Sequence, residues 1–94
     1  MENYIGKKIA ATHIPLIINP DSGFLYFNEK SVVFTTTLGD STIKIDYCDM
    51  SEVFRKRALF GIISCFCILT HHGEKYKFIV FNCAAVVEFL KSKI

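Results

Sequence analysis

The stretch FRKRALFGIISCFCIL, residues 54–69, places three consecutive cations before twelve residues in which only Gly61 and Ser64 interrupt the hydrophobicity. Such a run is either a membrane anchor with a basic flank or the interior of a folded domain. A helix needs about 20 apolar residues to cross the hydrocarbon core of a bilayer, and this run stops at the polar residues 70–72. It is too short to span a membrane, so we expect it to lie inside a fold.

A period of two in the same run predicts a strand that is covered on both faces. Cys65 and Cys67 fall on one side of an extended chain, and Phe66 falls on the other. Polar residues 71–74 then supply a turn, and residues 75–80 alternate again. The two runs therefore predict a β-hairpin.

Short segments rich in β-branched and aromatic residues recur along the rest of the chain, separated by turn signals. With the hairpin they make about seven strands, the pattern of an antiparallel barrel or sandwich. At Asn82, a favourable N-cap residue, the pattern changes to alanines followed by lysines, which predicts a C-terminal helix. An apolar stripe at helical spacing should pack on the sheet; it comprises Cys83, Val86, Val87, Leu90 and Ile94.

Length and composition favour a single domain, residues 1–94, that folds without disulfides or metal. Hydrophobic residues make up 51% of the chain, which excludes a disordered sequence. The formal net charge is +2 with cations and acids interleaved, so nothing demands a nucleic acid as partner. The N-terminus lacks the shape of a secretory signal, and we expect a cytoplasmic location.

Three stretches carry a family resemblance: GFLYFNEKSVVF (residues 23–34), IDYCDMSEVFRKRALFG (residues 45–61) and ILTHHGEKYKFIVFN (residues 68–82). With the helix that follows them, the chain resembles the GRAM and bacterial pleckstrin-homology-like domain family over about three quarters of its length. The resemblance implies a mainly β fold, a bent antiparallel barrel of about seven strands capped by one C-terminal helix. It also implies a non-enzymatic module that binds lipid headgroups, peptides or protein surfaces.

The basic residues Arg55, Lys56, Arg57 and Lys30 are candidate contacts for an anionic ligand or lipid. Alternation along an extended strand sends Arg55 and Arg57 to one face and Lys56 to the other. Cations also discourage pairing at strand edges, so a solvated edge is the alternative interpretation. The expected first loop, IINPDSG, has Asp21 and no cation where phosphoinositide-binding pleckstrin-homology domains place basic residues, which argues against a multi-phosphate pocket there.

The four cysteines are Cys48, Cys65, Cys67 and Cys83, and their spacing does not match that of common zinc sites. Their positions in apolar segments favour reduced, packed thiols in a cytosolic protein. A disulfide and a metal site are the alternatives. We expect no metal and no cofactor.

Motifs of enzymes are missing from the sequence: it has no phosphate-cradling glycine loop, no G-x-S-x-G and no H-E-x-x-H. We therefore expect a non-enzymatic interaction module of a bacterial protein that contacts a protein partner or copies of itself. Peripheral binding to anionic membrane is the alternative. Exposed apolar side chains, with Phe54, Leu59 and Phe60 as candidates, would favour protein contact, whereas a contiguous basic patch with an apolar tip would favour lipid.

Overall fold

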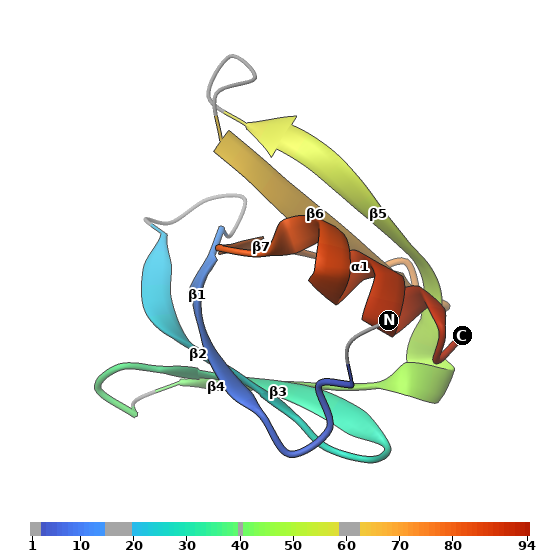
Figure 1. Cartoon of the computed structure of the whole chain (residues 1–94), viewed down its shortest axis with the longest axis horizontal. Helices are drawn as coiled ribbons and strands as arrows, with labels where there is room; N and C mark the ends of the chain where they lie inside the picture. Colours follow the sequence, from blue (N-terminus) through green and yellow to red (C-terminus); the bar gives the residue numbers. More distant parts are fainter. Residues whose placement is uncertain (1–2, 15–19, 40, 59–62) are drawn as a thin grey trace.

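Seven antiparallel strands form one curled sheet, a half-barrel, and a C-terminal helix closes it (Figure 1). The computed structural model describes residues 3–14, 20–39, 41–58 and 63–94. The predicted mainly β class, with about seven strands before one helix, is confirmed. The elements are β1 (Lys8–His13), β2 (Asp21–Phe27), β3 (Ser31–Thr36), β4 (Thr42–Asp46), a 3₁₀ turn η1 (Tyr47–Asp49), β5 (Met50–Ala58), β6 (Ile63–Thr70), β7 (Lys75–Val80) and α1 (Cys83–Lys91).

The strand order is β4-β3-β2-β1-β7-β6-β5. The strands β4 to β1 form one half of the sheet and β7 to β5 form the other, and β1 pairs with β7 where the halves meet. β1 pairs with β2 along its whole length, but its register with β7 covers only Ala11, Thr12 and His13. Beyond them, the N–H of Ile14 donates to the carbonyl of Lys77 at 2.9 Å. We call this short β1–β7 ladder the seam.

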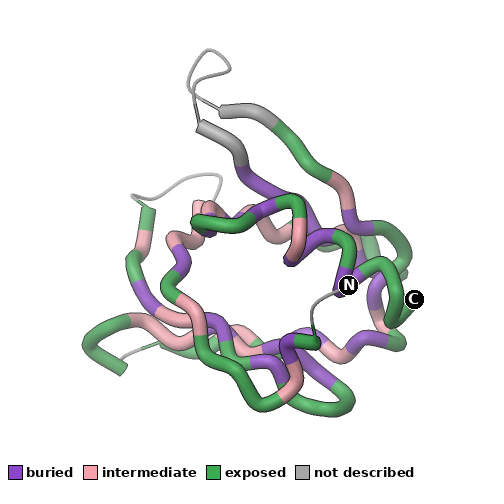
Figure 2. The backbone as a smooth tube through the Cα atoms, viewed as in Figure 1, coloured by how far each residue is buried: buried purple, intermediate pink, exposed green. Residues whose placement is uncertain are grey.

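The core fills the concave side of the curled sheet, and buried residues alternate with exposed ones along several strands (Figure 2). Phe78 lies at its centre, with ring centroids 5.4 Å from Phe34 and 5.6 Å from Phe66. All three rings are buried and come from strands of both halves. Aromatic packing across the concave face therefore holds the two halves together.

Helix α1 closes the half-barrel by inserting Phe89 between aromatic side chains. The Phe89 ring lies 5.5 Å from Tyr4 and 5.6 Å from Phe27, centroid to centroid. The predicted stripe is buried at Cys83, Val86, Val87 and Leu90. It was wrong at Ile94, which is half exposed because the helix ends at Lys91 and the last turn leaves the sheet. No helix in the described ranges is long and apolar enough to cross a membrane.

Gly23 determines how closely β2 and β3 approach. It pairs with Thr36, and a Cβ placed on it would lie 2.1 Å from the carbonyl oxygen of Thr35 and 2.8 Å from the Cα of Thr36. Both atoms belong to the backbone and cannot swing away as a side chain could. Any residue other than glycine would push the strands apart here.

We expect Gly23→Ala to lower the free energy of unfolding by roughly 1 to 3 kcal/mol, as overpacked interiors do. Urea unfolding followed by circular dichroism measures the effect. The matched control is Ser22→Ala at the neighbouring exposed position, which should stay within about 0.5 kcal/mol of the parent. Equal stability of the two variants would contradict the close approach of β3.

Candidate functional site

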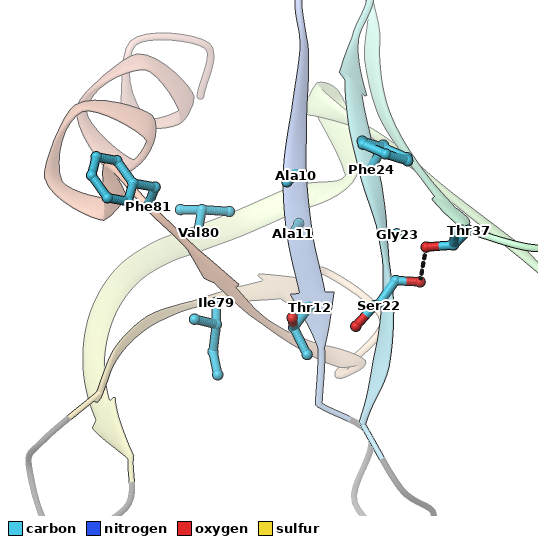
Figure 3. A pocket seen from close by; sticks show the side chains of 10 residues that line it. All are labelled: Ala10, Ala11, Thr12, Ser22, Gly23, Phe24, Thr37, Ile79, Val80 and Phe81. Atoms are coloured by element: carbon cyan, nitrogen blue, oxygen red, sulfur yellow. Dashed lines mark hydrogen bonds between the residues drawn. The ribbon is translucent and has the colours of Figure 1, made fainter.

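A shallow hollow of about 430 Å³ lies on the convex side of the seam (Figure 3). It is lined by residues of β1, β2 and β7 and by Thr37 and Phe81 beside them. Small side chains at Ala10, Thr12 and Ser22 leave the space, because long side chains at these positions would fill it. We call this feature the seam hollow.

Phe81 stands at one side of the seam hollow and is fully exposed. Val80 is buried and faces the core, so the alternation of a strand turns Phe81 outward. The helix begins only at Cys83, and in the described part of the chain nothing covers the ring. Burying a phenylalanine side chain is worth roughly 1.5 to 3 kcal/mol, so this exposure forgoes a large stabilisation.

Leu38 is the second strongly exposed apolar side chain, at 88%. It lies in the turn between β3 and β4, beside a smaller hollow that shares Ser22 and Thr37 with the seam hollow. Leu38 follows β3 and Phe81 follows β7, and in the strand order β2 and β1 lie between these two strands. We call Phe81 and the seam hollow together the seam patch.

A charged group stands beside the seam hollow at Lys8, whose Nζ lies 4.9 Å from the ring centroid of the lining residue Phe24. None of the ten described residues that line the seam hollow is ionisable. Lys7 lines a further hollow that shares Ala10 and Phe81 with the seam hollow, whereas Asp21 shares the core face of its register partner His13. An apolar centre with a polar rim is the usual anatomy of a protein contact surface.

The predicted basic residues do not share one surface. Arg55 pairs with Phe66, which faces the core, whereas Lys56 pairs with Cys65 on the convex face. Lys30 lies exposed in the turn between β2 and β3. The side chain of Arg57 lies outside the described residues.

Lysines gather instead on the convex face of β5, β6 and β7, around Cys67. Lys77, Lys56 and Lys75 each favour its thiolate, but burial outweighs them and raises the pKa of the Cys67 thiol. Cys67 is 1% exposed, and its register partners Phe54 and Lys77 flank it on the neighbouring strands. Long side chains with charged ends can cover apolar surface in this way.

Of the three predicted protein-contact residues, the structure describes only Phe54. Phe54 is half-buried on the convex face, and Leu59 and Phe60 lie outside the described residues. Sequence reasoning missed Phe81 and Leu38, although one signal for Phe81 was present. The inward alternation of residues 78 and 80 already turned residue 81 outward.

The four cysteines are free, with Cys65, Cys67 and Cys83 buried and Cys48 exposed. Burial raises the pKa of the Cys83 thiol, and the neighbouring Arg55 offsets this only in part. Within the described ranges, no group of three or more histidine, cysteine, aspartate or glutamate residues could hold a metal ion.

His13 ends β1 with its ring among aromatic side chains. Ring centroids lie 5.3 Å away at Phe78, 5.7 Å at Phe34 and 6.5 Å at Tyr76. Burial lowers the pKa of His13, and Asp21, its register partner on β2, counteracts this only in part. The fold therefore favours the neutral imidazole.

The lowered pKa of His13 predicts a domain that loses stability on acidification. The unfolded chain takes up this proton near pH 6.5, but the folded domain does so only at lower pH. The unfolded state then binds more protons below about pH 6.5 and is favoured there. We expect Tm to fall from about pH 7.5 to 5.5, and His13→Gln to reduce that slope.

Thermal melts across this pH range measure the difference. His71→Gln, at an exposed turn, is the matched control and should keep the slope of the parent. Identical slopes for the His13 variant and the parent would show that this ring does not cause the pH dependence.

Comparison with known proteins identifies the fold and no family. No protein-family model matches the chain, and no curated protein matches it significantly in sequence. Among solved structures, it is similar to the C-terminal domain of an unknown protein from Leishmania infantum, with a TM-score of 0.79 and 13% identity. The match covers 95% of this chain and 82% of the other. At this identity the likeness shows a shared fold alone.

Proposed function

We propose that this domain is a non-enzymatic interaction module that binds protein through the seam patch. The observation that carries the proposal is Phe81, a fully exposed ring beside an uncharged hollow. Aromatic residues are enriched at contact surfaces and often dominate their binding energy. A second strongly exposed apolar side chain, Leu38, lies in the turn between β3 and β4 beside a neighbouring hollow.

The composition of the seam hollow supports a binding role over catalysis. Its ten described lining residues include no histidine, cysteine, carboxylate, lysine or arginine, so groups suited to acid–base chemistry are absent from the lining. The hydroxyl of Thr37 donates to the carbonyl of Ser22 at 3.1 Å and is engaged in the fold. What the hollow offers a ligand is shape and apolar area.

The resemblance to GRAM and bacterial pleckstrin-homology-like domains supports the same proposal. Seven antiparallel strands followed by one closing helix are what that resemblance implies, and members of the family bind lipids, peptides or proteins. A fold hosts many functions, so the seam patch carries the argument. We propose a cytoplasmic setting in a bacterial protein, with which four free cysteines agree.

A photo-crosslinker placed at the seam patch tests this function. With benzoylphenylalanine in place of Phe81, irradiation in the cells of origin should give discrete protein adducts. The same group in place of Ile94, which is exposed outside the patch, should give several-fold less. Absence of adducts from position 81, or the same adducts from both positions, would contradict the proposal.

Binding to anionic membrane is the second candidate function, and the lysines around Cys67 favour it. Lys56, Lys75 and Lys77 share the convex face of β5, β6 and β7. Each cation near an anionic bilayer contributes about 1 kcal/mol, and physiological salt screens exposed charges beyond about 8 Å. Glu52 lies on the same face and opposes the attraction.

We therefore expect phosphatidylserine vesicles to bind the protein weakly, at low salt only. The double substitution Lys56→Glu and Lys77→Glu should abolish the residual binding in a co-sedimentation assay. Arg55→Glu, on the other face of β5, and Lys30→Glu are the controls and should reduce it less. Tight binding that survives physiological salt would favour the membrane over a protein as the partner.

A further inference from the structure

The main chain of β1 has an unpaired edge at its first three residues. β1 pairs with β2 along its whole length, whereas its register with β7 covers only Ala11, Thr12 and His13. In the described part of the chain, residues 8–10 therefore have a neighbouring strand on one side only. Such an edge presents main-chain donors and acceptors that a further strand can use.

Two hydrogen bonds show which main-chain groups point to this edge. The N–H of Phe27, at the end of β2, donates to the carbonyl of Lys7 at 3.0 Å. The N–H of Ile14 donates to the carbonyl of Lys77 on β7 at 2.9 Å. Along an antiparallel strand the main-chain groups of successive residues point to alternate sides, so odd-numbered residues of β1 face β2 and even-numbered residues face the β7 side.

Three main-chain groups lie beyond the end of the β1–β7 ladder on that side: the N–H of Ala10 and the N–H and C=O of Lys8. Among the described residues, none forms a hydrogen bond with these groups. Both residues are exposed, so a ligand can reach the groups from solvent. They match the main chain of an extended peptide, which carries the same donors and acceptors.

A hollow of about 350 Å³ lies beside this edge, and we call it the edge hollow. Its described lining is Tyr4, Lys7, Ile9, Ala10, Phe81 and Asn82. Ile9 packs against the core yet is only partly buried, because no strand covers it on the β7 side. The edge hollow shares Ala10 and Phe81 with the seam hollow, so the exposed ring stands beside both.

We propose that the edge hollow binds an extended peptide segment of a protein partner, which adds to β1 as a short antiparallel strand. This inference rests on the proposed protein-binding function and names the form in which the partner binds. The peptide residue opposite Lys8 exchanges two main-chain hydrogen bonds with it, and the carbonyl two residues earlier accepts from the N–H of Ala10. Strand addition to an open sheet edge is a recurrent mode of peptide recognition.

Alternation along the added strand predicts its side chains. The peptide residue opposite Ile9 points to the core side, where Ile9 and Tyr4 line the edge hollow, so an apolar side chain fits. The next residue, opposite Lys8, points to the convex face, where the Lys8 Nζ lies over the Phe24 ring. None of the described residues that line the edge hollow is acidic, so a carboxylate at this position complements the lysine. We therefore expect an apolar residue followed directly by an acidic one.

A displayed library of random linear peptides, selected against the whole domain, is the first test. Enriched peptides should share the apolar–acidic pair, and synthetic copies should bind with a micromolar Kd in fluorescence anisotropy. Lys8→Glu should weaken that binding several-fold, because it places two carboxylates together. The matched control Lys30→Glu, in the exposed turn between β2 and β3, should leave it unchanged. A selection that enriches no such pair would overturn the inference.

Ala10→Pro tests the main-chain contact itself, because proline lacks the N–H that donates to the peptide. This N–H does not belong to the β1–β2 ladder, and proline is tolerated at strand edges, so the variant should fold, which thermal melts check. Affinity for the selected peptide should fall about tenfold. Ala10→Ser keeps the N–H and should bind like the parent. Equal affinity of the proline variant and the parent would rule out strand addition.

Amide exchange of the unsubstituted protein, followed by NMR, is a test that depends on no variant. Without peptide, the amide protons of Lys8 and Ala10 should exchange faster than those of Ile9 and Ala11, which bond to β2. A saturating amount of the selected peptide should slow the exchange at Lys8 and Ala10. Protection before the peptide is added, or no protection after it, would contradict an open edge that takes up a strand.

The outcomes separate this inference from the proposed function. If position 81 cross-links to a protein and Ala10→Pro leaves those adducts undiminished, the partner binds the seam patch without adding a strand. The inference then fails and the proposed function stands. If position 81 gives no adduct, both proposals fail.

Discussion

The seam is the constraint on which the rest of this structure depends. It joins the two halves of the curled sheet through a short ladder. The inward residues of that ladder, Ala11 and Val80, enter the core, and the outward pair, Thr12 and Ile79, line the seam hollow. Core and candidate site are thus opposite faces of the same pairing, and a change that opens the ladder would disturb both.

The position of α1 explains why the seam patch is exposed. The helix closes the half-barrel through Phe89, and the chain leaves the sheet after Val80 to reach that place. Phe81 falls in this connection, where it has the outward direction of a strand residue without a neighbouring strand to cover it. The arrangement that completes the core therefore leaves a large apolar ring on the surface, beside small residues.

Local alternation was enough to predict the strands and the helix, because burial on one face imposes a period of two or 3.6. Alternation did not predict the 3₁₀ turn η1. Asn82 takes the predicted N-cap position, but its side chain makes no capping hydrogen bond. The seam hollow could not be predicted, because Ala10, Ser22 and Ile79 come from distant segments that only the strand order brings together. Arg55, Lys56 and Arg57 could be named as candidates because the charge of a residue can be read from the sequence. The exposure of an apolar ring depends instead on its neighbours in space.

The most direct measurement of where this domain makes contact compares a photo-crosslinker at the seam with one on the convex face of β5. Benzoylphenylalanine in place of Phe81 should give discrete protein adducts on irradiation in the cells of origin. The same group in place of Lys56 should give several-fold less. Absence of adducts from position 81, or stronger adducts from position 56, would contradict a contact surface at the seam.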